Sequence, residues 1–167
     1  MARLRSFALC VVAGLSVSPL AGAETLQLPG ASWGVHLDLP GFAIEGRGRN
    51  PATGGVMLKA HNRRTGLILT AFIERADGSP TAAECLAQTW PHARSRSRKD
   101  AELKRRRIGS MEVGEFTLRL DEHMANKHVN GFLGGPGGCV DVHLSKFPWQ
   151  ESDDALFDTV LRGVTLR

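Results

Sequence analysis

Short apolar–polar alternating segments, paired across tight turns, dominate the chain and most strongly constrain its fold. VMLKAH (56–61) and GLILTAFIE (66–74) flank Asn62–Thr65 and predict a long hairpin. HVNGFL (128–133) and CVDVHLSK (139–146) flank a glycine-rich turn and predict a second hairpin. The apolar content of 66–74 is high enough to expect burial of both faces of that strand. Because hairpins join neighbouring antiparallel strands, the sheet is expected to be mainly antiparallel.

Other strands are expected around these hairpins. WGVHLDL (33–39) alternates and is closed by Pro40-Gly41, and FAIEG (42–46) can form a second short strand. The turn-rich stretch 46–55 is the best candidate for a mobile loop. Residues 108–124 alternate around Gly114 and predict two strands or one bent pair.

Two helices complete the expected α+β class. Thr81 and Glu84 form a capping-box sequence, and apolar residues then follow at helical spacing until Pro91, which is expected to end or kink the helix at Trp90. A last helix is expected to begin at Ser152, with carboxylates in its first turn and Gly163 as its stop. Its apolar face consists of Leu156, Phe157, Val160 and Leu161. The sequence therefore predicts a mainly antiparallel sheet with helices packed against it.

The N-terminus has the three parts of a secretory signal peptide. MARLR is basic, FALCVVAGLSV is apolar, and Ala21-Gly22-Ala23 is a small-residue cleavage site. The apolar run is too short to span a bilayer, so residues 1–23 are interpreted as a signal peptide and residues 24–167 as one domain. The mature chain is then expected to be periplasmic or secreted, without a transmembrane anchor. Cleavage removes two of 21 basic residues and none of the 17 acidic ones, so the net charge falls from +4 to +2.

Cleavage also removes Cys10 and leaves Cys85 and Cys139 as an even pair in an oxidising compartment. A disulfide between them would stabilise the fold by roughly 4 kcal/mol on the chain-entropy model. The alternative is two separate buried thiols.

A basic run occupies residues 94–107 and has two interpretations. It can be a solvated connection between elements, or it can contact an anionic partner such as a lipid head group or an acidic protein surface. The exported location and the lack of interleaved aromatic residues argue against nucleic acid. The run consists of Arg94, Arg96, Arg98, Lys99, Lys104, Arg105, Arg106 and Arg107.

Asp141 and His143 are the polar pair on which an enzyme hypothesis depends. With Leu133 taken opposite Cys139, alternation places Cys139, Asp141 and His143 on one strand face and Phe132 with Val140 on the other. A thiolate, a histidine base and an aspartate would be the components of a cysteine hydrolase. Neighbours on one strand face lie too far apart for direct hydrogen bonding, however, and a disulfide at Cys139 would remove the nucleophile.

The histidine spacings match no zinc motif. His123 and His128 are five residues apart, which fits neither a helix face nor a strand face. No metal and no cofactor are therefore expected.

The order of elements resembles the PsbP-like α/β/α sandwich. The resemblance covers residues 33–167 and rests on WGVHLDLPGFAIEG, the central hairpin, the helix, the late hairpin and LFDTVLRGVTLR. It implies an antiparallel sheet with helices on both faces, in a fold used by accessory subunits, chaperone-like factors and binding proteins. No functional residue of that family can be transferred onto this chain.

The sequence thus predicts an exported, non-enzymatic accessory or binding protein that acts on a protein or an anionic envelope component. Two alternatives remain. One is a small hydrolase that uses Asp141 and His143. The other is an immunity-type protein that blocks a toxin aimed at the envelope.

Overall fold

One antiparallel sheet forms most of the molecule. The computed structural model describes residues 20–95, 103–122 and 124–167. Within that part, nine strands hydrogen-bond in the order β1-β2-β3-β4-β8-β7-β6-β5, and β9 pairs with β2. The elements are β1 (Leu20–Leu26), β2 (Val35–Arg49), β3 (Val56–Asn62), β4 (Leu67–Arg75), α1 (Ala82–Ser95), β5 (Leu103–Ile108), β6 (Met111–Arg119), β7 (Ala125–Gly135), β8 (Gly138–Lys146), the 3₁₀ turn η1 (Glu151–Asp153), α2 (Asp154–Arg162) and β9 (Val164–Leu166).

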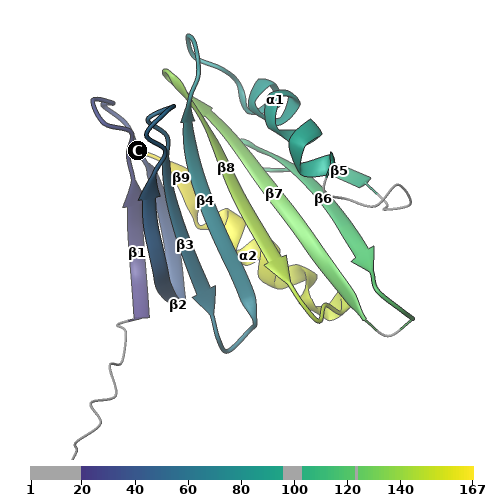
Figure 1. Ribbon diagram of the computed structural model, residues 1–167. Helices are drawn as coiled ribbons and strands as arrows, with labels where there is room; N and C mark the ends of the chain where they lie inside the picture. The colour runs from purple at the N-terminus through teal and green to yellow at the C-terminus, as the bar shows by residue number, and fades with distance from the viewer. Residues whose placement is uncertain (1–19, 96–102, 123) are drawn as a thin grey trace, which may run out of the picture.

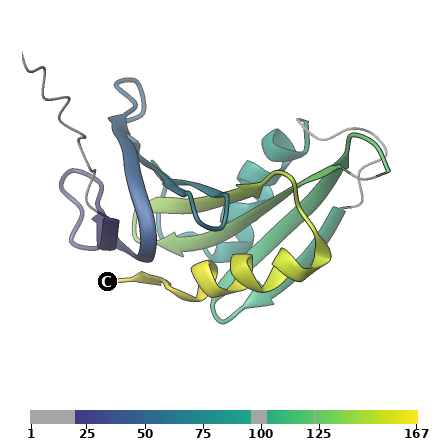
Figure 2. The same cartoon turned by 90° about the horizontal axis from the view of Figure 1, so that it is seen from below.

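The two helices lie on opposite faces of this sheet (Figures 1 and 2). Because alternate residues of a strand face opposite ways, Leu58, Leu69 and Val142 lie on the same side of the sheet. There they form a large core with Phe157 and Leu161 of α2. We call this side the α2 face. The other side, the α1 face, carries a smaller core made by Cys85, Leu86, Trp90, Phe116, Phe132 and Cys139. The predicted antiparallel sheet with packed helices is therefore confirmed, and strands outweigh helices in it.

Helix α1 begins as its sequence predicts. The backbone N–H of Thr81 donates to Glu84 Oε2 at 2.7 Å, and the backbone N–H of Glu84 donates to Thr81 Oγ1 at 3.3 Å. Of the two effects expected of Pro91, a helix end at Trp90 is wrong, because the helix continues through Pro91 to Ser95. Pro91 is exposed, whereas Trp90 is buried. Proline removes one backbone hydrogen-bond donor from the helix, and the packing of buried residues such as Trp90 against the sheet stabilises the helix there.

A disulfide joins α1 to the sheet. Cys85, on the inner face of α1, is bonded to Cys139 in β8, with an S–S distance of 2.00 Å. The predicted pairing is confirmed, and both residues are buried.

Strand β2 is longer than predicted. It continues through Pro40-Gly41 to Arg49, and the positive φ of 79° at Gly41 allows the bend. No ladder partner faces Pro40 among the described strands, so its missing N–H costs no strand pairing. The expected loop at 46–55 is therefore shortened to a turn at residues 50–55.

The β7–β8 hairpin is present, but its predicted register is wrong by one residue. Gly135 pairs with Gly138 across a two-residue turn, so Leu133 faces Val140 rather than Cys139. Phe132 consequently shares the α1 face with Cys139, because it lies opposite Asp141.

The C-terminal segment differs from expectation at its start and its end. Ser152 does not cap the last helix; instead Asp153 Oδ2 accepts from the backbone N–H of Gln150 at 2.9 Å. The predicted apolar stripe and the stop at Gly163 are confirmed. Beyond Gly163 the chain forms β9, a strand that the sequence did not indicate.

Among the described residues, no helix is long and apolar enough to cross a membrane.

Candidate functional site

Helix α1 covers only one part of the α1 face. It packs mainly on β6, β7 and β8, and no helix lies over β3 and β4 in the part of the chain that the structure describes (Figure 1). The outward side chains of these two strands form what we call the open face. They are Met57, Lys59, His61, Ile68, Thr70, Phe72 and Glu74.

The open face corrects the expectation that residues 66–74 are buried on both sides. Leu67, Leu69 and Ala71 are buried, whereas Ile68 is 40% exposed and Phe72 is half-buried. Strand β4 therefore has more apolar side chains than the core buries, and two of them, Ile68 and Phe72, lie at the surface.

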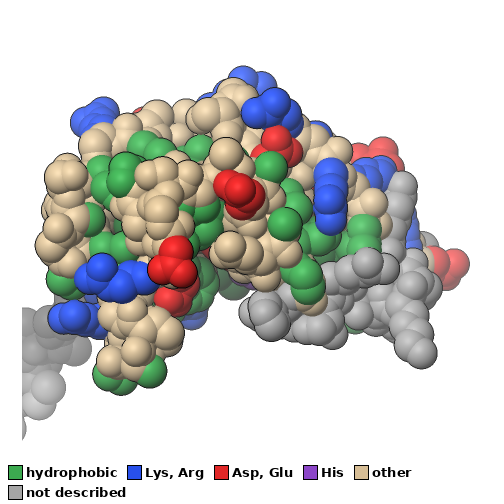
Figure 3. Space-filling view, turned by 90° about the horizontal axis from the view of Figure 1, so that it is seen from above, with side chains coloured by type: hydrophobic (Ala, Val, Ile, Leu, Met, Phe, Trp, Pro, Cys, Tyr) green, Lys and Arg blue, Asp and Glu red, His purple; other side chains and the backbone are tan. Residues whose placement is uncertain are grey.

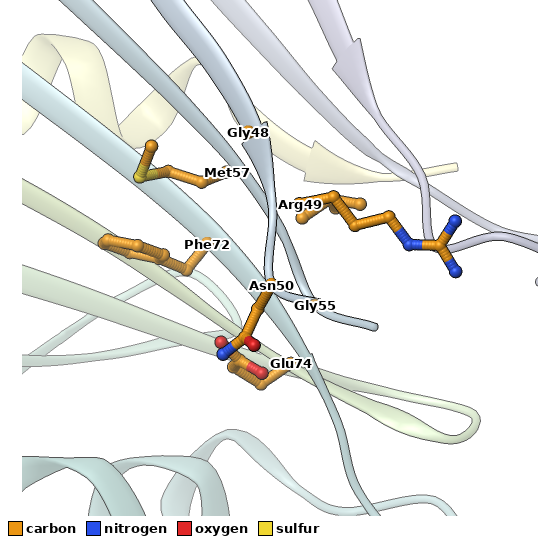
Figure 4. Close-up of a pocket in the computed structure, with 8 residues that line it drawn as sticks. Gly48, Arg49, Asn50, Gly55, Met57, Phe72 and Glu74 are labelled. Carbon is orange, nitrogen blue, oxygen red and sulfur yellow. The ribbon is translucent and has the colours of Figure 1, made fainter. Parts of the chain in front are cut away.

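A hollow of about 250 Å³ lies at the end of the open face, beneath the β2–β3 turn (Figure 4). Met57 and Phe72 supply its apolar side, and Glu74 supplies a carboxylate. Figure 3 looks at this end of the molecule and shows hydrophobic side chains across the middle, with Lys and Arg toward the margins. The lining residues are Gly48, Arg49, Asn50, Gly55, Val56, Met57, Phe72 and Glu74.

The β2–β3 turn holds Glu74 in place. Asn50 Oδ1 accepts from the backbone N–H of Ala52 at 3.0 Å, which fixes the turn. Thr53 Oγ1 then donates to Glu74 Oε2 at 2.8 Å. Gly55 packs against the same carboxylate so closely that a Cβ there would lie 2.4 Å from Oε2. The position of Glu74 thus depends on a turn far from it in sequence.

The charges beside the other end of the open face are satisfied within the chain. Lys59 Nζ lies 2.9 Å from Glu45 Oε2, and His61 Nδ1 lies 3.7 Å from Glu45 Oε1. The hydrogen bond from Lys59 lowers the pKa of Glu45 below its ordinary value. This carboxylate is therefore engaged with its own neighbours.

The predicted polar pair lies on the α1 face, but the two side chains bond to other residues. Asn130 Nδ2 donates to Asp141 Oδ1 at 2.8 Å. His143 Nε2 lies 3.0 Å from His128 Nδ1, and Phe116 stacks on the His128 ring with centroids 4.7 Å apart. These diagonal contacts between β7 and β8 were not predicted from the sequence, since they depend on the hairpin register. Cys139 is in the disulfide, so the hypothesis of a cysteine nucleophile is wrong.

Residues 103–107 of the basic run belong to the edge strand β5, and residues 94–95 form the end of α1. In β5, Lys104 and Arg106 point to the α2 face and Arg105 and Arg107 to the α1 face, because alternate residues of a strand face opposite ways. Basic side chains on an edge strand discourage pairing with other chains. Arg96, Arg98 and Lys99 lie outside the described residues, and so does the side chain of Arg94.

Two of these arginines form ion pairs within the chain. Arg106 Nη2 lies 2.6 Å from Asp158 Oδ1, and its Nε lies 3.3 Å from Glu115 Oε2. Arg107 Nε lies 2.9 Å from Glu112 Oε1. The structure does not gather residues 104–107 into one basic surface.

A second hollow, of about 170 Å³, lies on the α2 face between β2 and the end of α2. Phe42, Leu67 and Val160 give it an apolar lining, with Asp38 and Arg64 beside them. Neither hollow has the ligands for a metal ion, and the described residues contain no group of three His, Cys, Asp or Glu that could hold one.

Comparison with known proteins shows a similarity of fold alone. No protein-family model and no curated protein matches the chain. A crystal structure from Bacteroides thetaiotaomicron VPI-5482 superposes with a TM-score of 0.51 at 9% sequence identity. The match covers 80% of this chain and 45% of that one, so this chain spans less than half the length of the structure that it resembles.

Proposed function

We propose that the protein is an exported, non-enzymatic binding module whose open face contacts a partner protein. One observation carries the proposal: Met57, Ile68 and Phe72 point outward from β3 and β4 with no helix of the described chain over them. Met57 lies opposite Phe72, and Ile68 lies further along β4 beyond Thr70, so apolar side chains occur at both ends of a face that the fold leaves uncovered. Exposed apolar surface is a feature of interaction sites. An uncovered strand surface beside a hollow also suits a protein partner, which can lie along the strands and insert a side chain.

Export is supported by two independent features. The first 23 residues have the basic, apolar and small-residue pattern of a signal peptide. The disulfide between Cys85 and Cys139 is a kind of bond that persists in oxidising compartments.

A protein partner is favoured over an anionic envelope component because of the charges on β5. Arg106 and Arg107 pair with carboxylates of the same chain, and alternation divides the strand's cations between two faces. An anionic surface would require these cations to be available on one side.

An enzymatic function is not favoured by the contacts of the polar pair. Asp141 is bonded to Asn130, and His143 lies against His128. Neither side chain lies in the hollow beside Phe72.

We also infer that the chain has the PsbP-like α/β/α sandwich, supported by helices on opposite faces of an antiparallel sheet.

The proposal is tested by quantitative capture from an envelope extract of the cells that make the protein. Immobilised wild type is compared with an Ile68→Ser/Phe72→Ser variant and with Leu120→Ser/Phe147→Ser, which changes exposed apolar residues outside the open face. We expect the open-face variant to recover about tenfold less partner and the control variant to match wild type. Arg105→Glu should also match wild type. Equal recovery by both serine variants, or a loss with Arg105→Glu alone, would contradict the proposal.

A further inference from the structure

We propose that the hollow beside Phe72 receives a lysine or arginine side chain of the partner protein, with Glu74 as its counter-ion. This inference rests on the proposed function, because it assigns one contact of the partner to one end of the open face. It adds a charge preference, which an apolar surface alone does not have.

Glu74 is a half-buried carboxylate whose bonding capacity is only partly used. Its side chain accepts one hydrogen bond, from Thr53 Oγ1 to Oε2 at 2.8 Å. Glu74 forms no ion pair with any residue that the structure describes. A carboxylate with two oxygens can accept several donors, so Oε1 is available to a cation.

Neither of the two arginines near the hollow forms an ion pair with Glu74. Arg75 Nη2 donates to the carbonyl oxygen of Pro29 at 2.9 Å. The guanidinium of Arg49 points away from Glu74 (Figure 4). The hollow therefore contains one carboxylate that forms no ion pair with a described residue, and Arg49 contributes to the lining without pairing with it.

The rest of the lining suits the remainder of a basic side chain. The ring of Phe72 and the thioether of Met57 form an apolar wall beside Glu74 (Figure 4). Lysine and arginine carry a long aliphatic stem that packs on apolar surface while the charged end remains solvated or paired. A cation that reaches an aromatic face also gains from the ring quadrupole.

The size of the hollow favours a single side chain over a whole small molecule. Its volume of about 250 Å³ lies below the roughly 300–1,000 Å³ of typical small-molecule sites. Gly48 and Gly55 bring bare backbone to its wall, so an extended partner strand can approach closely. A residue projecting from such a strand would reach Glu74 past Phe72.

The test is an NMR titration of the ¹⁵N-labelled mature protein with four capped pentapeptides, acetyl-Gly-Ala-X-Ala-Gly-amide, in which X is arginine, lysine, norleucine or citrulline. We expect the arginine and lysine peptides to shift the amides of Gly48, Gly55 and Phe72–Glu74 in a saturable manner. Norleucine and citrulline should bind at least about tenfold more weakly, because they lack the charge.

Glu74→Gln should reduce affinity for the basic peptides to that of norleucine, while Glu45→Gln, which changes a carboxylate already paired with Lys59, should leave it unchanged. The dispersion of each variant's spectrum shows that it is folded. Equal binding of norleucine and arginine, or no change with Glu74→Gln, would overturn the charge preference while leaving the proposed function intact. An absence of any localised shift with all four peptides would overturn the side-chain site itself. Loss of partner capture by the open-face variant would still support the proposed function in that case.

Discussion

The indole of Trp90 packs directly on the backbone of Gly114, and a Cβ at position 114 would lie 2.6 Å from the ring. The same ring makes a tilted contact with Phe116, with centroids 6.1 Å apart, and an edge contact with Phe132 at 6.5 Å. Trp90 thus attaches α1 to the centre of the β6–β7 pair, and the absence of a side chain at Gly114 makes this possible.

A methyl group at this position should destabilise the fold. We expect Gly114→Ala to lower the free energy of unfolding by about 1–3 kcal/mol, since the ring must shift out of its packed position. Urea unfolding followed by Trp fluorescence measures this loss. Gly46→Ala is the matched control, because a Cβ at Gly46 meets nothing within 4 Å. Equal effects of the two substitutions would contradict the close packing of Trp90 on Gly114.

The disulfide should be a major source of stability. It closes a sequence separation of 54 residues, for which the chain-entropy model predicts about 4 kcal/mol. We expect dithiothreitol to lower the urea midpoint of the wild type markedly. The Cys85→Ala/Cys139→Ala variant should show no response to the reductant, which separates loss of the bond from other effects of thiols. An unchanged wild-type midpoint after complete reduction would show that the bond contributes little.

The start of α1 should make stability depend on pH. The backbone hydrogen bond from Thr81 lowers the pKa of Glu84 below its ordinary value of 4.5. Because the folded pKa is the lower one, the ionised carboxylate stabilises the fold above about pH 4.5, and this contribution disappears as the pH falls through the folded pKa. Glu84→Gln should therefore be less stable than wild type at pH 7 and equal to it at strongly acidic pH. Urea midpoints of both proteins from pH 7 to pH 3 measure the difference, and a constant difference would contradict the role of the charge.

Export predicts a specific N-terminus. We expect protein purified from the producing cells to begin at Glu24, by intact mass and N-terminal sequencing. Such cleavage removes Leu20–Ala23 from β1 but leaves Glu24, Thr25 and Leu26 paired with β2. Thiol titration of the denatured, unreduced mature protein should find no free thiol. A chain that retains Cys10 would contradict the interpretation of residues 1–23.

Local patterns predicted the parts of the fold that depend on neighbours in sequence. The β3–β4 hairpin, the Thr81–Glu84 cap and the apolar stripe of α2 all follow from residues a few positions apart. The disulfide was also predictable, because the predicted signal peptide contains Cys10 and leaves only Cys85 and Cys139 in the predicted mature chain. These features need no knowledge of which strands become neighbours.

Features set by long-range pairing were not predictable. The register of β7 and β8 depends on a two-residue turn, and a shift of one residue moved Phe132 to the other face. Strand β5 is basic and lacks an apolar pattern, so only its pairing with β6 reveals it. The hollow was missed for the same reason, since Gly48, Met57 and Phe72 meet only once β2, β3 and β4 are aligned.

The most direct test of the central claim is site-specific photocrosslinking in the cells that make the protein. A photoreactive amino acid is placed at Ile68, on the open face, or at Leu120 or Leu166, which are exposed outside it. We expect one protein adduct of defined mass from position 68. This adduct should be absent from positions 120 and 166, and added wild-type mature protein should compete with its formation. No adduct from position 68, or the same adduct from all three positions, would contradict the claim that the open face binds a partner.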